Sequence, residues 1–232
     1  AVEIAAAGRH NILFIGPPGS GKSMLLKRLP SIMPDLNEEE ALSTYKIQSI
    51  SQQHIMKNEF STNVPFRSPH HSISYAGMVG GGSKPTPGEI SLAHNGILFL
   101  DELPEFNRQV LEVLRQPIET KSIIISRASL SLTYPANFML VAAMNPCPCG
   151  YFGDLKKQCA CSPTQINRYQ HKLSGPILDR FDIILEIPRL KKDDFTNKHE
   201  LTLDLSEKMK HNVCSARKKQ SKRYQKNIQN GH

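Results

Sequence analysis

Three short apolar runs stand out along the chain, and each is followed by polar or glycine residues. They span Ile12 to Ile15, Gly96 to Leu100 and Phe138 to Met144. None of the three contains a polar side chain, and the last two have the pattern typical of strands buried on both faces of a parallel sheet. The residues that follow these strands are therefore expected at the carboxyl edge of one sheet.

Helices and further strands are predicted between these runs. Ser23 to Leu29 and Arg108 to Leu114 have the apolar spacing of short helices, and residues 122 to 135 (SIIISRASLSLTYP) form two strand-like pieces. Helices that alternate with buried strands indicate the α/β class, an αβα sandwich with a mostly parallel sheet. Residues 61 to 96, rich in Gly, Pro, Ser and His, predict long loops or a hairpin insertion.

Charge divides the chain into two parts. Residues 1 to 190 carry 18 basic and 16 acidic residues, whereas residues 191 to 232 carry 11 and 5, so this tail holds +6 of the net +8. Spaced Leu, Met and Val among the tail charges suggest helices. We expect a core domain over 1–190 and a smaller basic unit over 191–232. Such a tail is compatible with nucleic acid, although a solvated helix face or a partly disordered end is the commoner use.

Targeting and membrane segments are not recognisable in the sequence. The start lacks a basic region followed by a long apolar one, and no apolar run approaches the ~20 residues of a membrane span. We expect a soluble, cytoplasmic protein. Because the chain begins with Ala and reaches a strand almost at once, we also expect it to be a piece of a longer protein.

The segment GPPGSGKS matches the phosphate-loop pattern G-x-x-x-x-G-K-[ST] and lies between a predicted strand and a predicted helix. Its backbone N–H groups would surround phosphate oxygens at a helix amino terminus. The lysine would reach the β- and γ-phosphates of ATP, and the last serine would hold Mg²⁺. The predicted nucleotide-binding residues are Gly16, Pro17, Pro18, Gly19, Ser20, Gly21, Lys22 and Ser23.

Polar residues follow the other two buried strands. Asp101 and Glu102 come directly after GILFL, where a carboxylate can hold the Mg²⁺ shell and a second one can position or deprotonate the attacking water. Asn145 follows FMLVAAM, where its amide can bind the γ-phosphate or that water. The alternatives are that the acidic pair only begins a helix and that Asn145 is an ordinary turn residue.

Arg180, in SGPILDRFD, has two interpretations. It can pair with Asp179 or Asp182, or it can act as an arginine finger in a neighbouring subunit's nucleotide site, which requires an oligomer.

Four of the five cysteines fall within fifteen residues. Cys147, Cys149, Cys159 and Cys161 form two C-x-C pairs separated by nine residues, close to small zinc sites in loop size but not in the spacing within each pair. A structural Zn²⁺, free thiols and disulfides remain open, with disulfides disfavoured in a reducing cytosol. Four thiolates would close the coordination shell, so a catalytic zinc is not expected. Cys214 is alone in the basic tail.

The sequence as a whole resembles the AAA+ ATPases of the magnesium-chelatase-like group, and within it the ComM/YifB type. The segments that carry the resemblance are distributed from Ala1 to about Arg223. They are AAAGRHNILFIGPPGSGKSMLLKRLPSIMP, PFRSPHHSIS, GGGSKPTPGEISLAHNGILFLDELPEF, LRQPIE, AAMNPCPCG and SGPILDRFD.

This resemblance implies an AAA+ core followed by the start of a small helical lid, ATP hydrolysis with Mg²⁺, and assembly into a hexameric ring. It makes Gly16 to Ser23 the Walker A motif, Asp101 and Glu102 the Walker B motif, Asn145 sensor 1 and Arg180 the arginine finger.

Proteins of the ComM type resemble motors that act on DNA, in branch migration during recombination and natural transformation. Related chelatase subunits instead drive Mg²⁺ insertion into a porphyrin, and a nucleotide-dependent scaffold that does not hydrolyse ATP is a third possibility. The family pattern also includes a protease-like domain before the core and a lid that reaches a sensor-2 arginine. We expect the chain to contain neither, and by itself to bind ATP and hydrolyse it poorly.

Four further residues keep open roles. Arg127, in the predicted strand pair, is a candidate DNA contact, and a ring-interface or core-edge position is at least as consistent with the sequence. Arg67, His70 and His71 lie in the PFRSPHH block, where hydrogen bonds that fix a loop are favoured over metal binding.

Overall fold

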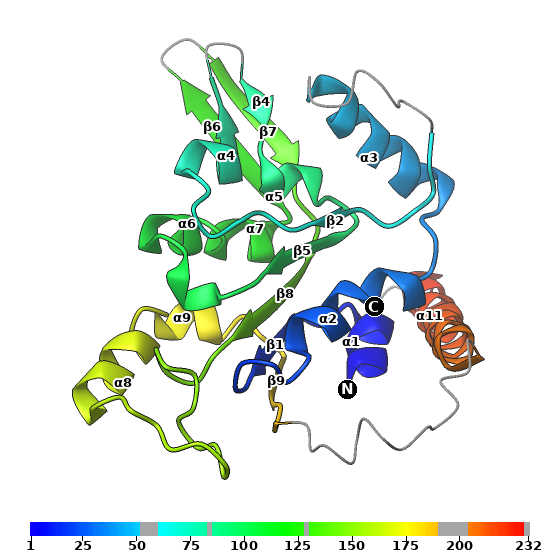
Figure 1. Cartoon of the computed structure of the whole chain (residues 1–232). Coiled ribbons are helices and arrows are strands. Elements are labelled where there is room, and N and C mark those ends of the chain that lie inside the picture. The colour runs from blue at the N-terminus through cyan, green and yellow to red at the C-terminus, as the bar shows by residue number, and fades with distance from the viewer. Residues whose placement is uncertain (52–59, 83–84, 128–129, 190–203, 230–232) are drawn as a thin grey trace.

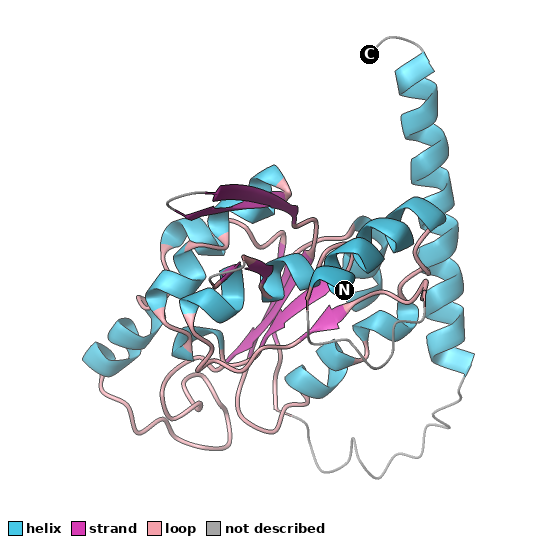
Figure 2. Cartoon of the chain, turned by 90° about the horizontal axis from the view of Figure 1, so that it is seen from above, coloured by secondary structure: helices cyan, strands magenta, loops and turns pink. Residues whose placement is uncertain are grey.

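The computed structural model describes residues 1–51, 60–82, 85–127, 130–189 and 204–229. Five parallel strands form one central sheet in the order β2-β5-β8-β1-β9 (Figure 1). Helices lie on both sides of this sheet (Figure 2), so the predicted αβα architecture is confirmed. The strands are β1 (Ile12–Ile15), β2 (Phe66–Arg67), β5 (Ile97–Leu100), β8 (Met139–Met144) and β9 (Ile183–Glu186).

Successive side chains of each strand point to opposite faces of the sheet, and they form two hydrophobic cores, one on each face. In β5, Ile97 and Phe99 face one core, and Leu98 and Leu100 face the other. All four are fully buried. Strands of this kind have no polar face, which is why their sequences are continuous apolar runs.

The first core, which contains Ile97 and Phe99, is covered by the helix that precedes β1, by the helices that follow β1 and by the helix at the end of the chain. The elements on this side include α1, α2, η1 and α11. Their bounds are α1 (Val2–Gly8), α2 (Lys22–Lys27), η1 (Leu29–Ile32) and α11 (Asp204–Gln229). A further helix, α3 (Glu38–Ile50), packs against α5 (Glu89–Leu92). It begins at Asn37 with a reciprocal capping box between Asn37 and Glu40.

The second core is covered mainly by the elements inserted between the later strands. They are α4 (Tyr75–Val79), α5 (Glu89–Leu92), η3 (Leu103–Glu105), α6 (Arg108–Glu112), α7 (Arg115–Thr120), α8 (Pro163–Gln170) and α9 (Gly175–Leu178). The predicted helix from Arg108 to Leu114 is therefore shorter in the structure: α6 ends at Glu112, and a turn at residues 113–114 precedes α7.

Two small antiparallel pairs lie outside the central sheet. The predicted strand pair at 122 to 135 is confirmed as β6 (Ser122–Arg127) and β7 (Leu130–Pro135), a hairpin that extends from the top of the molecule in Figure 1. The Gly-rich segment contributes β3 (Gly80–Gly81) and β4 (Thr86–Pro87), and Tyr134 donates a 3.0 Å hydrogen bond from its hydroxyl to the Pro85 carbonyl. The side chain of Arg127 lies outside the described residues.

The described part of the basic tail is one long helix, α11, which packs on α1 and η1 (Figure 1). Val213 is fully buried there, and Arg217 donates a 2.7 Å hydrogen bond to the Ala6 carbonyl. The expected boundary near residue 190 falls outside the described residues. Within the described residues, no helix combines the length and apolar character needed to cross a membrane; the cytoplasmic location stays a prediction.

Candidate functional site

The loop between β1 and α2 has the conformation that its glycines allow. Gly19 and Gly21 have φ angles of 75° and 80°, in the left-handed region that other residues rarely adopt. Gly16 is required for a different reason, since a Cβ at this position would lie 2.3 Å from the Ile187 carbonyl oxygen. The Ser20 hydroxyl donates to the Pro17 carbonyl at 2.9 Å and closes the turn.

Lys22 lies inside this loop rather than in solvent. Its Nζ donates to the carbonyl oxygens of Gly16 and Pro17, both at 2.8 Å, and lies 3.4 Å from Asn145 Oδ1. Burial lowers the pKa of Lys22, and the negative charge of Asp101 opposes that shift. The ammonium group therefore sits where the loop, the end of β5 and the end of β8 converge.

This convergence follows from the topology of the sheet. β1 lies between β8 and β9, and the chain leaves β1 for β2 at one edge but leaves β8 for β9 at the other. Ligands of open α/β sheets bind outside the carboxyl ends of the strands at such a reversal. The predicted phosphate loop and Asn145 flank it.

Asp101 and Glu102 follow β5, as predicted, and Glu102 has an unusual backbone. Its φ and ψ are 53° and 47°, a left-handed conformation, and its N–H donates to Asp101 Oδ1 at 3.0 Å. Non-glycine residues in this region are strained, and such strain is concentrated at functional sites. The carboxylate of Glu102 is more than half exposed, and its Oε2 lies 3.4 Å from His71 Nδ1.

The PFRSPHH block is fixed by hydrogen bonds in the way the sequence favoured. Arg67 forms two hydrogen bonds of 2.6 Å with the Glu89 carboxylate, which raise the pKa of Arg67. His70 Nδ1 lies 2.8 Å from the Ser72 hydroxyl, and the His70 and His71 rings are 4.0 Å apart. Glu89 was missed from the sequence because nothing in its spacing links it to Arg67. The contact from His71 to Glu102 was also missed.

Arg180 lies near the opposite end of β1 from the phosphate loop. Its carbonyl accepts a 2.8 Å hydrogen bond from the Asn11 side chain, and Asn11 directly precedes β1. The Arg180 guanidinium forms an ion pair with Glu119 of α7. Among the described residues Arg180 thus pairs with Glu119, and with neither Asp179 nor Asp182 as suggested. The Asp182 carboxylate accepts the Asn11 N–H at 2.7 Å.

The four clustered cysteines converge after β8. Their sulfur atoms all lie within 4.8 Å of one another, and no other group of three or more His, Cys, Asp or Glu residues in the described ranges is placed to hold a metal ion. All are free thiols. Cys147 is buried and the other three are partly exposed.

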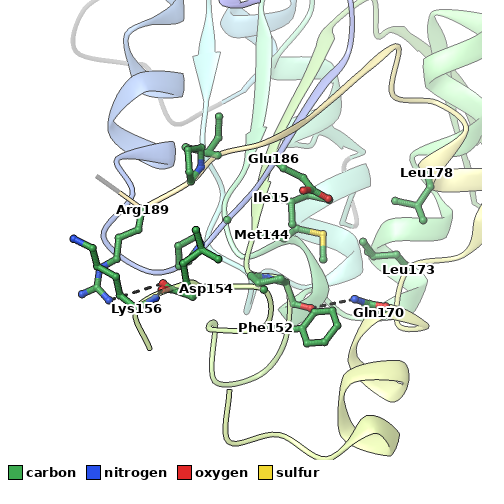
Figure 3. Close-up of a pocket in the computed structure, with 17 residues that line it drawn as sticks. Ile15, Met144, Phe152, Asp154, Lys156, Gln170, Leu173, Leu178, Glu186 and Arg189 are labelled. Atoms are coloured by element: carbon green, nitrogen blue, oxygen red, sulfur yellow. Dashed lines mark hydrogen bonds and ion pairs between the residues drawn. The ribbon is translucent and has the colours of Figure 1, made fainter. Parts of the chain in front are cut away.

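Residues 145–162, between β8 and α8, carry the four cysteines and are called the cysteine segment below. A cavity of about 740 Å³ lies between this segment and the phosphate loop (Figure 3). Gly16 and Pro17 line one side, and residues 152–156 of the cysteine segment line another. Arg189, which follows β9, forms a 3.8 Å ion pair with Asp154 at one side of this cavity. The cysteine segment, the phosphate loop and the end of β9 thus share the walls of one cavity.

Comparisons with known proteins give a consistent result. The family profile described as "Magnesium chelatase, subunit ChlI" matches residues 1–195. The chain is 51% identical to the uncharacterized protein YifB of Escherichia coli over 97% of its length, and 52% identical to the competence protein ComM of Haemophilus influenzae over 85%. It spans 44% and 38% of these two relatives, so less than half of each is represented.

Proposed function

The chain belongs to the magnesium-chelatase family of AAA+ proteins, and on this basis we propose that it is the ATP-hydrolysing module of a ring-shaped motor that acts on DNA. The observation that carries the ATPase part is the meeting of three segments at one edge of the sheet. Lys22 of the loop, Asn145 after β8 and the charge of Asp101 after β5 surround one point.

Each of these residues has a role in hydrolysis. The loop N–H groups and Lys22 bind the phosphates, while the Ser23 hydroxyl and the Asp101 carboxylate are hard oxygen ligands of the kind that Mg²⁺ prefers. Mg²⁺ bound with ATP would neutralise charge on the phosphates. Asn145 orients the γ-phosphate or the water that attacks it.

Glu102 acts on the attacking water. It orients the water toward the γ-phosphorus and accepts its proton as the new O–P bond forms and the bond to the bridging oxygen of ADP breaks. In the structure its carboxylate lies near His71 and is largely exposed, so it is accessible to a water molecule.

Arg180 cannot serve the nucleotide site of its own subunit. Asn11 holds the Arg180 carbonyl at the amino end of β1, and the phosphate loop begins after the carboxyl end of the same strand. Four residues of strand separate the two by about 13 Å along β1. Arg180 can therefore act as an arginine finger only in a neighbouring subunit, which supports assembly into a ring. The family resemblance implies six subunits in this ring.

We assign residues 1–190 to the ATPase core and 191–232 to the start of the lid; the helix of this second unit, α11, packs on α1 and η1 of the core. The basic residues of α11 and the relative named a competence protein support DNA as the substrate of the complete protein. The family description, a magnesium chelatase subunit, supports an alternative in which ATP hydrolysis drives metal insertion with partner subunits.

The test is the ATPase rate of the complete protein with and without branched DNA. DNA should stimulate turnover, and an ATPase rate that changes with neither single-stranded nor branched DNA would contradict the motor.

Mixing Arg180→Ala and Lys22→Ala proteins tests the ring: each variant alone should be inactive, and the mixture should recover part of the activity. Wild-type turnover by Arg180→Ala alone would rule out the finger.

A further inference from the structure

We propose that Cys147, Cys149, Cys159 and Cys161 bind one structural Zn²⁺. We further propose that the cysteine segment, called the zinc loop once the metal is bound, holds the phosphate loop in its conformation. Three of the sulfur–sulfur distances are 3.4 Å (Cys147 to Cys149), 3.5 Å (Cys149 to Cys159) and 3.7 Å (Cys147 to Cys159). A tetrahedral zinc with sulfur ligands at about 2.3 Å places those sulfurs about 3.8 Å apart. The thiols are thus already arranged as a zinc site.

A disulfide fits this geometry less well than a metal ion does. It requires sulfur atoms about 2.05 Å apart, far closer than the sulfurs of these three pairs. Four sulfur ligands in a tetrahedron select zinc or iron, and a closed shell without a water position is typical of structural zinc. The site therefore has no open position for catalysis.

Backbone groups complete the site. The N–H of Cys149 points to Cys161 Sγ at 3.4 Å, the N–H of Cys161 to Cys159 Sγ at 3.4 Å, and the N–H of Phe152 to Cys147 Sγ at 3.3 Å. Such N–H groups would orient the sulfur ligands once a metal is bound.

The segment has little else to hold its shape. It contains turns but no helix or strand between β8 and α8, Leu155 is fully exposed, and Phe152 is half exposed. Without an apolar core of its own, a loop of this length would gain much of its folding free energy from the metal.

The zinc loop also touches the nucleotide site. Gly150, between the two halves of the cysteine cluster, packs so closely on the phosphate loop that a Cβ there would lie 2.5 Å from Pro18 Cδ. The loop also lines the cavity beside Gly16 and Pro17, and it is tied to the end of β9 by the Asp154–Arg189 ion pair. Loss of the metal would release this support and weaken nucleotide binding.

Metal analysis of the protein purified without chelator tests the site independently of any nucleotide. We expect about one zinc per chain, and Cys214 as the thiol that reacts readily before denaturation. Cys149→Ser and Cys161→Ser should each lose the zinc, whereas the Cys214→Ser control should keep it. Substoichiometric zinc with five freely titratable thiols, or stoichiometric iron in place of zinc, would overturn the proposal.

A second measurement does not depend on whether the variants fold. Protein stripped of metal and titrated with Co²⁺ should develop the visible absorption of tetrahedral cobalt bound by four thiolates, and the absence of that band would also refute the site.

The effect of the metal on the phosphate loop is tested by comparing the ATP affinity of the zinc-loaded and the metal-stripped wild-type protein. Binding should weaken several-fold on stripping; equal affinities in protein with the same circular dichroism would refute the coupling while leaving the zinc site intact.

Discussion

Lys22 Nζ and Asn145 Oδ1 lie 3.4 Å apart, although 123 residues separate them in the sequence. The lysine is 8% exposed and also binds two carbonyl oxygens of its own loop. These contacts hold the ammonium group at the position where the phosphates of ATP would replace the carbonyls as its partners.

Replacing Lys22 by Ala should therefore abolish tight nucleotide binding. Charge-assisted hydrogen bonds to phosphate are lost, and the dissociation constant for ATP should rise by on the order of a hundredfold. Binding is measured by calorimetry with Mg²⁺ present. Lys27→Ala, at an exposed position of the same helix, should bind ATP as the wild type does. Equal affinity of both variants would show that the lysine does not reach the phosphates.

Replacing Glu102 by Gln should separate binding from hydrolysis. The amide keeps the size of the side chain and cannot accept a proton, so turnover in the complete protein should fall by about 100- to 10,000-fold. ATP should still bind and should remain uncleaved in the site. The comparison is between single-turnover hydrolysis and the amount of bound ATP recovered by filtration. Unchanged turnover would remove Glu102 from the role of activating water.

Two glycines of the cysteine segment form a matched pair. Gly150 and Gly153 have φ angles of 83° and 80°, but a Cβ on Gly150 would meet Pro18, whereas one on Gly153 meets nothing within 4 Å. Alanine at either position should cost about 1–2 kcal/mol of stability through backbone strain. Gly150→Ala should also displace the phosphate loop and weaken ATP binding by about tenfold or more. If both variants bind ATP equally, the contact with Pro18 has no effect on the nucleotide site.

His94 should make the fold sensitive to mild acid. Its ring is buried between Ser43 and the N–H of Asn137, which donates to Nδ1 at 3.1 Å, and burial lowers the pKa of His94 to about 4. The unfolded chain binds this proton near pH 6.5. Between pH 6.5 and 4 the unfolded state therefore holds more protons, and stability falls as the pH falls.

Between pH 7 and pH 5 this single residue should remove about 2 kcal/mol from the free energy of unfolding. Urea denaturation at several pH values measures the loss. His94→Gln should flatten the pH dependence, while the exposed control His171→Gln should keep the steep fall. An equally steep dependence in His94→Gln would assign the effect to other groups.

Three of the five sheet strands, β1, β5 and β8, could be predicted from sequence because each is a continuous apolar run. The edge strands β2 and β9 were not predicted, since β2 has only two residues, one of them an arginine, and β9 is partly exposed and ends in a glutamate. The phosphate loop, Asp101 and Asn145 could be predicted for a related reason, since parallel strands bring whatever follows them to one edge. The same logic predicted neither Glu89 as the partner of Arg67 nor Glu119 as the partner of Arg180. Both contacts join separate elements that cover the sheet, and apolar periodicity carries no information on how charged residues of such elements pair.

The cysteines illustrate the same limit from the other side. Their spacing left zinc, free thiols and disulfides open, because C-x-C pairs do not by themselves determine how the sulfur atoms lie. The folded chain brings all four sulfurs within 4.8 Å of one another, with backbone N–H groups directed at three of them. Only the path of the backbone between Cys149 and Cys159 could supply that information.

Asn11 joins three segments through one short side chain and its own N–H. Its Oδ1 accepts from Leu140 N in β8, its Nδ2 donates to the Arg180 carbonyl, and its N–H donates to Asp182. The hydrogen bonds of Asn11 thus connect β1, which precedes the phosphate loop, to the segment that contains Arg180. In the proposed ring, Asn11 would thus fix the position of Arg180, which enters the neighbour's nucleotide site, relative to the strand that carries the subunit's own phosphate loop. Asn11 itself would contact the nucleotide of neither site.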